Sequence, residues 1–180
     1  ISVIGDAKRG DVGHSAKMYA KAVFEIFRCD AVTVSPYLGL DALQPFFEYK
    51  DRGVFILCLT SNQGANDFQL PDLHLNVAKK VQQWNVSGNT GLVVGATFPE
   101  NIKAIRKITG QMPYLIPGIG TQGGDLDKTL LYADDNSKLP YLINASRSII
   151  YASSREDYAD QAGIVAKGLR DRINSFRSSL

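Results

Sequence analysis

The stretch Val54-Phe-Ile-Leu-Cys-Leu59-Thr60-Ser61-Asn62 decides the fold class, because six apolar residues in a row are followed at once by three polar ones. A strand with one wet face would alternate apolar and polar residues, whereas a continuous apolar run is typical of a parallel strand buried on both faces. The sequence therefore predicts a buried parallel strand over residues 54–59, with polar side chains at its carboxyl end.

The same cycle of a short apolar strand, a polar strand end and an amphipathic helix repeats along the chain. The expected strands cover residues 1–5 with an extension through 8, 31–34, 54–59, 91–95, 114–116 and 141–145, and the expected helices cover residues 15–28, 40–49, about 71–84, 99–108, a short segment after 124, and 157–176. Ser15 is expected to cap the first helix, and Pro99 suits a first helical turn. Six such cycles predict a parallel sheet with helical crossovers.

Two architectures contain such a sheet, the doubly wound sheet and the barrel. A doubly wound dinucleotide-binding domain should carry G-x-G-x-x-G after its first strand, and Asp6-Ala-Lys-Arg-Gly-Asp11 stands there instead. Polar residues follow every strand, which is the pattern of an α/β fold of the (β/α)8 TIM-barrel type, with about 250 residues and eight units. We therefore expect residues 1–180 to form a single barrel domain that supplies strands 3–8 and is truncated at its N-terminus.

Composition and charge argue against several classes of function. The 180 residues include 20 basic and 18 acidic ones, and the resulting net charge of +2 predicts no bulk attraction to nucleic acid or to a membrane. No apolar run approaches the roughly 18 to 20 residues of a membrane span. Cys29 and Cys58 lie beside apolar residues, which favours buried reduced thiols in a cytoplasmic protein. With only His14 and His74, a histidine metal site is not expected.

Asp6, Lys8 and Asp11 form the candidate reactive centre, within a segment that has four charges in six positions. If the first strand continues through Lys8, Asp6 and Lys8 share a face and project side by side. Each then stabilises the charged form of the other, which makes Lys8 a protonated donor and Asp6 a fixed negative charge. Asp11, in the following turn, reaches either back over this site or out to a neighbour. The alternative is a solvated charged turn.

A second candidate site involves the segment Pro117-Gly-Ile-Gly-Thr-Gln122-Gly-Gly124, which has four glycines in eight residues. Glycine lets backbone N–H groups approach an anion, and the following helix adds its positive N-terminus. Arg147 follows the next strand, and its guanidinium can pair with phosphate oxygens in a fork. Loops after the last two strands of a barrel commonly bind phosphate, so these segments together predict a phosphate site. A mere tight turn is the alternative for the glycine-rich loop alone.

Taken together, these motifs resemble the orotidine 5′-monophosphate decarboxylase family, in its longer-chain branch. The motifs that carry the resemblance, in the family's order over nearly the whole chain, are Asp6-Ala-Lys8-Arg-Gly-Asp11, Val32-Thr-Val-Ser-Pro-Tyr-Leu-Gly39, Thr60-Ser61-Asn62, Val94-Gly-Ala-Thr97, Pro117-Gly-Ile-Gly-Thr-Gln122-Gly-Gly and Ser146-Arg147. D-x-K-x-x-D alone is shared with related sugar-phosphate enzymes. Ser15 stands where the family usually has threonine. The family's first two strands, which carry an aspartate touching the ribose and a lysine of the charge network, are absent from these residues.

The resemblance implies the decarboxylation of orotidine 5′-monophosphate to uridine 5′-monophosphate in pyrimidine biosynthesis, with no metal and no cofactor. Lys8 would stabilise the carbanion and deliver a proton to C6 of the pyrimidine. Asp6 would orient Lys8 next to the departing carboxylate. Asp11 and the hydroxyl of Ser15 would reach into the partner subunit's site and hold the ribose there.

The resemblance also implies the residues that bind the substrate. Ser61 would hydrogen-bond the pyrimidine, and Gln122 and Arg147 would grip the phosphate beneath a closing loop. Pro117 belongs to that binding loop, with the alternative that it only shapes the loop. An alternative role for Ser61 is to cap the insertion that follows it.

The implied partners are orotidine 5′-monophosphate and uridine 5′-monophosphate, and a second copy of the chain in a homodimer with shared active sites. A fused orotate phosphoribosyltransferase domain is a further partner if the parent protein is bifunctional. Two alternatives stay open. A related sugar-phosphate lyase or synthase would use Asp6, Lys8 and Asp11 around a magnesium ion. A catalytically inactive fragment would only bind phosphorylated ligands.

Overall fold

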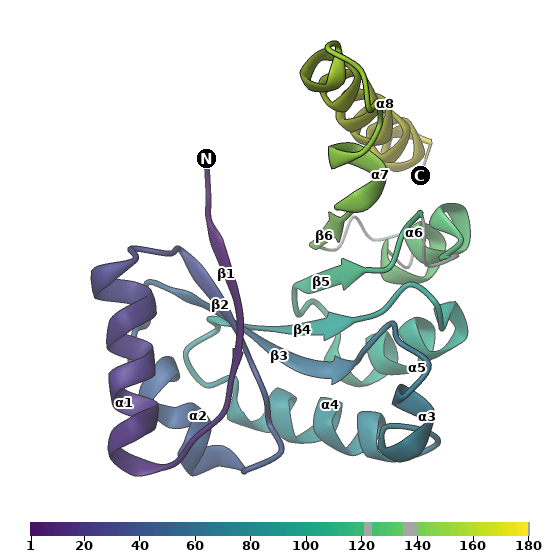
Figure 1. Cartoon of the computed structure of the whole chain (residues 1–180). Helices are drawn as coiled ribbons and strands as arrows, with labels where there is room; N and C mark the ends of the chain where they lie inside the picture. Colours follow the sequence, from purple (N-terminus) through teal and green to yellow (C-terminus); the bar gives the residue numbers. More distant parts are fainter. Residues whose placement is uncertain (121–123, 135–139, 180) are drawn as a thin grey trace.

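The computed structural model describes residues 1–120, 124–134 and 140–179, which contain one sheet of six parallel strands (Figure 1). The strands are β1 (Ile4–Arg9), β2 (Ala31–Val34), β3 (Gly53–Leu59), β4 (Thr90–Val94), β5 (Tyr114–Pro117) and β6 (Tyr141–Asn144). The helices are α1 (Gly13–Lys21), which continues as the π-helical segment η1 (Ala22–Ile26), α2 (Leu40–Phe47), α3 (Ala65–Phe68), α4 (Leu73–Trp84), α5 (Pro99–Thr109), α6 (Leu126–Asp134), α7 (Arg147–Ile150) and α8 (Tyr158–Ser178).

The spatial order of the strands follows their order in the chain, from β1 at one edge to β6 at the other. Each strand runs parallel to the next one, and helices form the crossovers between them. A doubly wound sheet would change direction at a switch point, and this strand order has none. The sheet is curled, and α7 and α8 extend from its β6 end (Figure 1). The prediction of six βα units of a (β/α)8 barrel is confirmed.

Both faces of the sheet are buried, as the apolar run of β3 predicts. Val54 and Ile56 belong to the large core between the sheet and the helices. Phe55 belongs to a smaller inner cluster with Ala31 and Val93. Successive residues of a strand point to opposite faces, so one face packs on the helices while the other fills the inside of the curled sheet.

The start of the first helix differs from the prediction. Helix α1 begins at Gly13, and Val12 is its N-cap residue. Ser15 therefore lies within the first turn, and the prediction that it caps the helix is wrong. The Asp11 carboxylate accepts a hydrogen bond from the Val12 N–H (2.8 Å), so a local side chain-to-backbone bond orders the chain just before the helix instead.

The other predicted elements occur with small shifts of their ends. Strand β1 begins at Ile4 rather than Ile1, and the insertion after Asn62 contains the short helix α3, which was not expected. Residues 135–139 of the predicted polar loop lie outside the described residues. None of the helices within residues 1–120, 124–134 and 140–179 combines the length and apolar character needed to cross a bilayer.

Cys29 and Cys58 are buried and free, which confirms the prediction of buried thiols. The Cys58 thiol, in β3, donates a hydrogen bond to the carbonyl oxygen of His74 (3.2 Å). Burial raises the pKa of Cys58 to about 12, because a thiolate inside the core would lack solvation. The thiol is therefore protonated and unreactive at neutral pH.

At pH 8 we expect Cys58 in the folded protein to react with a disulfide reagent at least about 10³-fold more slowly than in the unfolded chain, because a thiol whose pKa is about 12 is almost entirely protonated at that pH. The measurement follows the chromophoric thiolate that the reagent releases when it reacts with the Cys29→Ser variant, in which Cys58 is the reacting thiol. The same variant in guanidinium chloride is the control. Equal rates in the two states would show that Cys58 is accessible.

Candidate active site

A cavity of about 490 Å³ opens at the carboxyl ends of the strands. The strand residues that line it are Ile4, Asp6, Lys8, Leu57, Val93, Leu115, Pro117 and Asn144, and the loop and helix residues are Thr60, Ser61, Asn62, Gly118, Ile119, Ser146 and Arg147. The apolar members Ile4, Leu57 and Leu115 also pack against the inner cluster of the sheet. The cavity therefore lies on the inner core, and its polar groups come from the strand ends.

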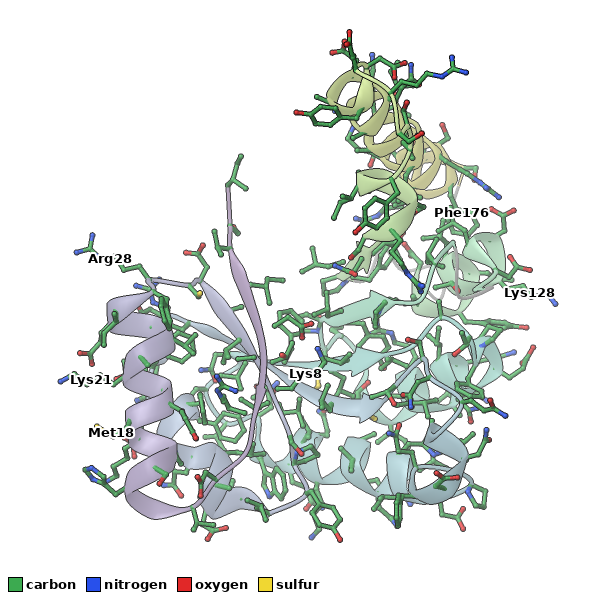
Figure 2. All side chains as sticks on the ribbon, in the orientation of Figure 1. Lys8, Met18, Lys21, Arg28, Lys128 and Phe176 are labelled. Atoms are coloured by element: carbon green, nitrogen blue, oxygen red, sulfur yellow. The ribbon has the colours of Figure 1, made fainter. Side chains whose placement is uncertain are left out.

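Asp6 and Lys8 project from β1 into this cavity, and the Lys8 ammonium donates a hydrogen bond to the Asp6 carboxylate. Lys8 lies beside β1 in the middle of the molecule, whereas Lys21 and Arg28 extend outward (Figure 2). The Asp6 and Lys8 side chains are 63% and 51% exposed. An ion pair this open to water contributes at most about 1 kcal/mol to folding. The pair adds little stability, and both groups remain accessible to a molecule in the cavity.

The surroundings of Asp6 favour its ionised form. Partial burial raises the pKa of Asp6, but the hydrogen bonds from Lys8 and Thr33 and the charge of Lys8 together outweigh it, so the pKa lies below its usual value. A lowered pKa means that the carboxylate persists to a lower pH than in an ordinary aspartate. The cavity thus holds a fixed negative charge beside an ammonium.

Thr33, in β2, is a site residue that the sequence patterns did not single out. Its hydroxyl donates a hydrogen bond to Asp6 Oδ1 (2.9 Å) and accepts one from the Lys8 N–H (3.0 Å). Thr33 is two residues after Ala31, a member of the inner cluster, so it shares the inward face of β2. A polar residue on the inward face of an apolar strand is the signal that could have identified it, because buried hydroxyls need partners.

The loop that carries Ser61 lies against β4 because of a glycine. A Cβ atom on Gly95 would lie 2.7 Å from both the Cα and the backbone N of Ser61. The Thr97 hydroxyl donates a hydrogen bond to the Ser61 carbonyl oxygen (3.1 Å). On the other side, the Thr60 N–H donates to the side-chain oxygen of Gln69 (2.7 Å). Contacts on both sides therefore hold Ser61 at the cavity wall.

The predicted phosphate site contributes the β5 and β6 side of the cavity, through Pro117, Gly118 and Arg147. The φ angles of Gly118 and Gly120 are 98° and 92°, in the left-handed region that favours glycine. Arg147 is the first residue of α7, which follows β6 after Ala145 and Ser146. Gln122, the other predicted phosphate ligand, lies outside the described residues.

Asp11 and Ser15 do not line the cavity of this chain. Both lie at the start of α1, where Asp11 accepts the Val12 N–H and Ser15 is exposed. Of the predicted site residues, the structure therefore brings together Asp6, Lys8, Ser61, Pro117 and Arg147, and it leaves Asp11 and Ser15 outside the cavity.

Two carboxamides that were not predicted, Asn62 and Asn144, also line the cavity. A carboxamide can both donate and accept hydrogen bonds, so the wall suits a ligand with mixed polar groups. In the part of the chain that the structure describes, no cluster of three or more His, Cys, Asp or Glu side chains is arranged to hold a metal ion. The charged groups of the cavity are the ion pair at β1 and the guanidinium after β6.

Residues 1–162 match the model of the Orotidine 5′-phosphate decarboxylase / HUMPS family. The chain belongs to this family. The orotidine 5′-phosphate decarboxylase of Ralstonia nicotianae is 50% identical over 184 residues, which cover 99% of this chain and 68% of that relative. The chain thus spans about two thirds of the length of this curated decarboxylase.

Solved structures agree with membership of the decarboxylase family. The OMP decarboxylase of Leishmania donovani has a TM-score of 0.84 at 40% identity, and the match covers 98% of this chain and 68% of that one. The UMP synthase of the same organism has a TM-score of 0.87 at 42% identity, and the match covers 98% of this chain and 40% of that one. These matches confirm the predicted family, and they give no support to the two alternative functions.

A methyl group at Gly95 should disturb the Ser61 loop. We expect Gly95→Ala to lower the free energy of unfolding by about 1–3 kcal/mol, because the added Cβ overlaps backbone atoms of Ser61. Backbone atoms cannot move aside as the end of a flexible side chain could. Urea denaturation measures the change. The matched control is Gly163→Ala in α8, where nothing lies within 4 Å and a gain of about 0.5–1 kcal/mol is expected. Unchanged stability of Gly95→Ala would contradict the close approach.

Proposed function

We propose that this chain carries the centre that decarboxylates orotidine 5′-monophosphate to uridine 5′-monophosphate without a metal or cofactor. One observation carries the proposal: the Asp6–Lys8 ion pair and the Arg147 guanidinium open into the same cavity from different edges of the sheet. A pyrimidine nucleotide has its reacting ring at one end and its phosphate at the other. The cavity offers a proton donor for the first and a cation for the second.

The chemical step needs a cation where negative charge develops. Cleavage of the bond between C6 and the carboxylate releases carbon dioxide and leaves the electron pair on C6. Lys8 stabilises that charge and then transfers a proton from its ammonium to C6, after which the neutral amine regains a proton from water. Asp6 accepts a hydrogen bond from the Lys8 ammonium and so orients it in the cavity, and the lowered pKa of Asp6 keeps the carboxylate ionised to a lower pH than in an ordinary aspartate.

Binding of the rest of the substrate is assigned to the other walls. Ser61 hydrogen-bonds the pyrimidine, while Arg147, with Gln122 and the loop that begins at Pro117, holds the phosphate. The position of Arg147 and Pro117 in the cavity wall, on the side opposite β1, supports this role. Energy gained at a phosphate remote from C6 can align the ring with Lys8, so that it appears in the rate as well as in the affinity.

We further propose a homodimer in which Asp11 and Ser15 hold the ribose in the partner subunit's site. Their position at the start of α1, outside the chain's own cavity, supports this role. Tyr37 and Phe68 are 83% and 76% exposed and line a second cavity of about 470 Å³, and such exposed apolar surface is typical of an interface.

Two finer proposals concern context. The buried free thiols of Cys29 and Cys58 support a cytoplasmic location, because reducing compartments keep thiols unpaired. The similarity to a UMP synthase, of which the match covers 40%, supports a fused orotate phosphoribosyltransferase domain in the parent protein.

The Lys8→Ala variant tests the proton donor. We expect its kcat for orotidine 5′-monophosphate to fall by about 10³-fold or more, because it lacks both the proton and the charge that stabilises the carbanion. Loss of absorbance of the orotate ring measures the rate, both with and without excess chelator. Lys21→Ala, on the exposed side of α1, is the matched control and should retain full activity. Full activity of Lys8→Ala would refute the mechanism, and loss of wild-type activity in chelator would favour a magnesium-dependent enzyme.

The Arg147→Ala variant tests the proposed binding of the substrate phosphate by Arg147. We expect its KM for orotidine 5′-monophosphate to rise by about 10- to 100-fold, as expected when a charge-assisted hydrogen bond is lost. With orotidine, which lacks the phosphate, the variant and the wild type should have the same kcat/KM. Arg155→Ala, in the exposed segment between α7 and α8, is the control. An equal loss with both substrates would place Arg147 elsewhere in the site.

A further inference from the structure

The hydroxyl of Thr33 joins the two halves of the reactive pair. Thr33 is only 1% exposed, and its Oγ1 is 3.0 Å from the backbone N of Lys8 and 2.9 Å from Asp6 Oδ1. The Lys8 N–H can only donate, so the hydroxyl accepts from it and directs its single proton to the carboxylate. The hydroxyl therefore accepts a hydrogen bond from Lys8 and donates one to Asp6.

This arrangement occurs at an irregularity of the sheet. Gly5 pairs with Val32 and Arg9 pairs with Val34, so residues 6–8 of β1 face Thr33 alone on β2. The Lys8 backbone has a φ of 47°, which is uncommon for a residue with a side chain. A bulged strand loses regular ladder partners, and here the Thr33 side chain supplies the acceptor for the Lys8 N–H.

We propose that Thr33 is a positioning residue for the decarboxylation, whose hydroxyl fixes the Asp6 carboxylate and the bulged backbone of Lys8 so that the ammonium points into the cavity. This inference rests on the proposed function. One bond orients Asp6 so that its other oxygen, Oδ2, meets the Lys8 ammonium. The second bond holds the main chain from which the ammonium extends. Thr33 itself does not line the cavity, so it acts through its two neighbours.

The effect of Thr33 on the pKa of Asp6 can be measured separately from the effects of the charged groups nearby. Lys8 faces the carboxylate from β1 and Thr33 faces it from β2, while Arg147 is the remaining charged residue along the described cavity wall. Thr33 is one of the causes that lower the pKa of Asp6. Its removal should therefore raise that pKa toward the usual aspartate value even when Lys8 and Arg147 are intact.

The test uses the full-length protein with Thr33→Val, which keeps the shape and removes the hydroxyl, and Thr33→Ser, which keeps the hydroxyl. We expect kcat for orotidine 5′-monophosphate to fall by about 10- to 100-fold in Thr33→Val, with KM changed by less than about 3-fold, and Thr33→Ser to recover most of the rate. The matched control is Thr90→Val, at the buried start of β4, where no described residue bonds the hydroxyl. It should keep the wild-type kcat.

A second readout does not depend on turnover. Titration of the Asp6 carboxyl carbon by NMR should show a raised pKa in Thr33→Val and the wild-type value in Thr33→Ser and Thr90→Val. If the Thr33→Val protein is unfolded at the assay temperature, Thr33→Ala replaces it.

A wild-type kcat in Thr33→Val, an unshifted Asp6 titration, or a Thr33→Ser variant as slow as Thr33→Val would each overturn the positioning role. A wild-type protein that does not consume orotidine 5′-monophosphate would refute the proposed function instead, and the titration would still decide whether Thr33 controls Asp6.

Discussion

The curl of a parallel sheet, which turns alternate side chains of every strand into one enclosed space, is the constraint on which the site depends. Inward residues in the middle of the strands are apolar and fill that space, as Phe55 and Val93 do. Inward residues at the carboxyl ends are released from the packed core and meet solvent, so polar groups can stand there at little cost. Asp6, Lys8 and Asn144 occupy such positions. The floor of the cavity and its polar wall are therefore successive parts of the same strands.

The Asp6–Lys8 ion pair is held in place by its neighbours, although it adds little to stability. The ion pair is open to water, and the left-handed backbone of Lys8 costs of order 1 kcal/mol. Such a conformation persists only where its surroundings determine it, and here the determinants are the register shift against β2 and the buried Thr33 hydroxyl. The helices and the large core on the outer face stabilise β2, so the energy that keeps the pair in place comes from packing remote from the cavity.

The sequence predicted the sheet well because its strands are short apolar runs that end in polar residues, and β2 and β3 occur almost where expected. It predicted Asp6 and Lys8 because a spacing of two residues fixes a shared face. It failed at Ser15, since a capping residue is defined by the backbone turn before it and not by its type alone. It missed the role of Thr33: the sequence places a hydroxyl on an inward face, but the partners of that hydroxyl depend on the pairing of two strands, and a register shift cannot be recognised from either strand alone.

The two charged ends of the cavity come from opposite edges of the sheet, Lys8 from β1 and Arg147 from the start of α7, which follows β6. Within residues 1–120, 124–134 and 140–179, the two groups lie at the two edges of the sheet, so the distance between the Lys8 ammonium and the Arg147 guanidinium depends on the curl accumulated across the six strands. Residues that only pack the inner layer then also affect the distance between the two charged groups. Gly91 is an example: a Cβ there would lie 2.6 Å from the Phe55 ring, so the absence of a side chain lets the inner layer close. A substitution that opens the curl at any strand pair would separate the Lys8 ammonium from the Arg147 guanidinium without contacting either residue. The packing of the inner core therefore determines the spacing of the charged groups at the cavity.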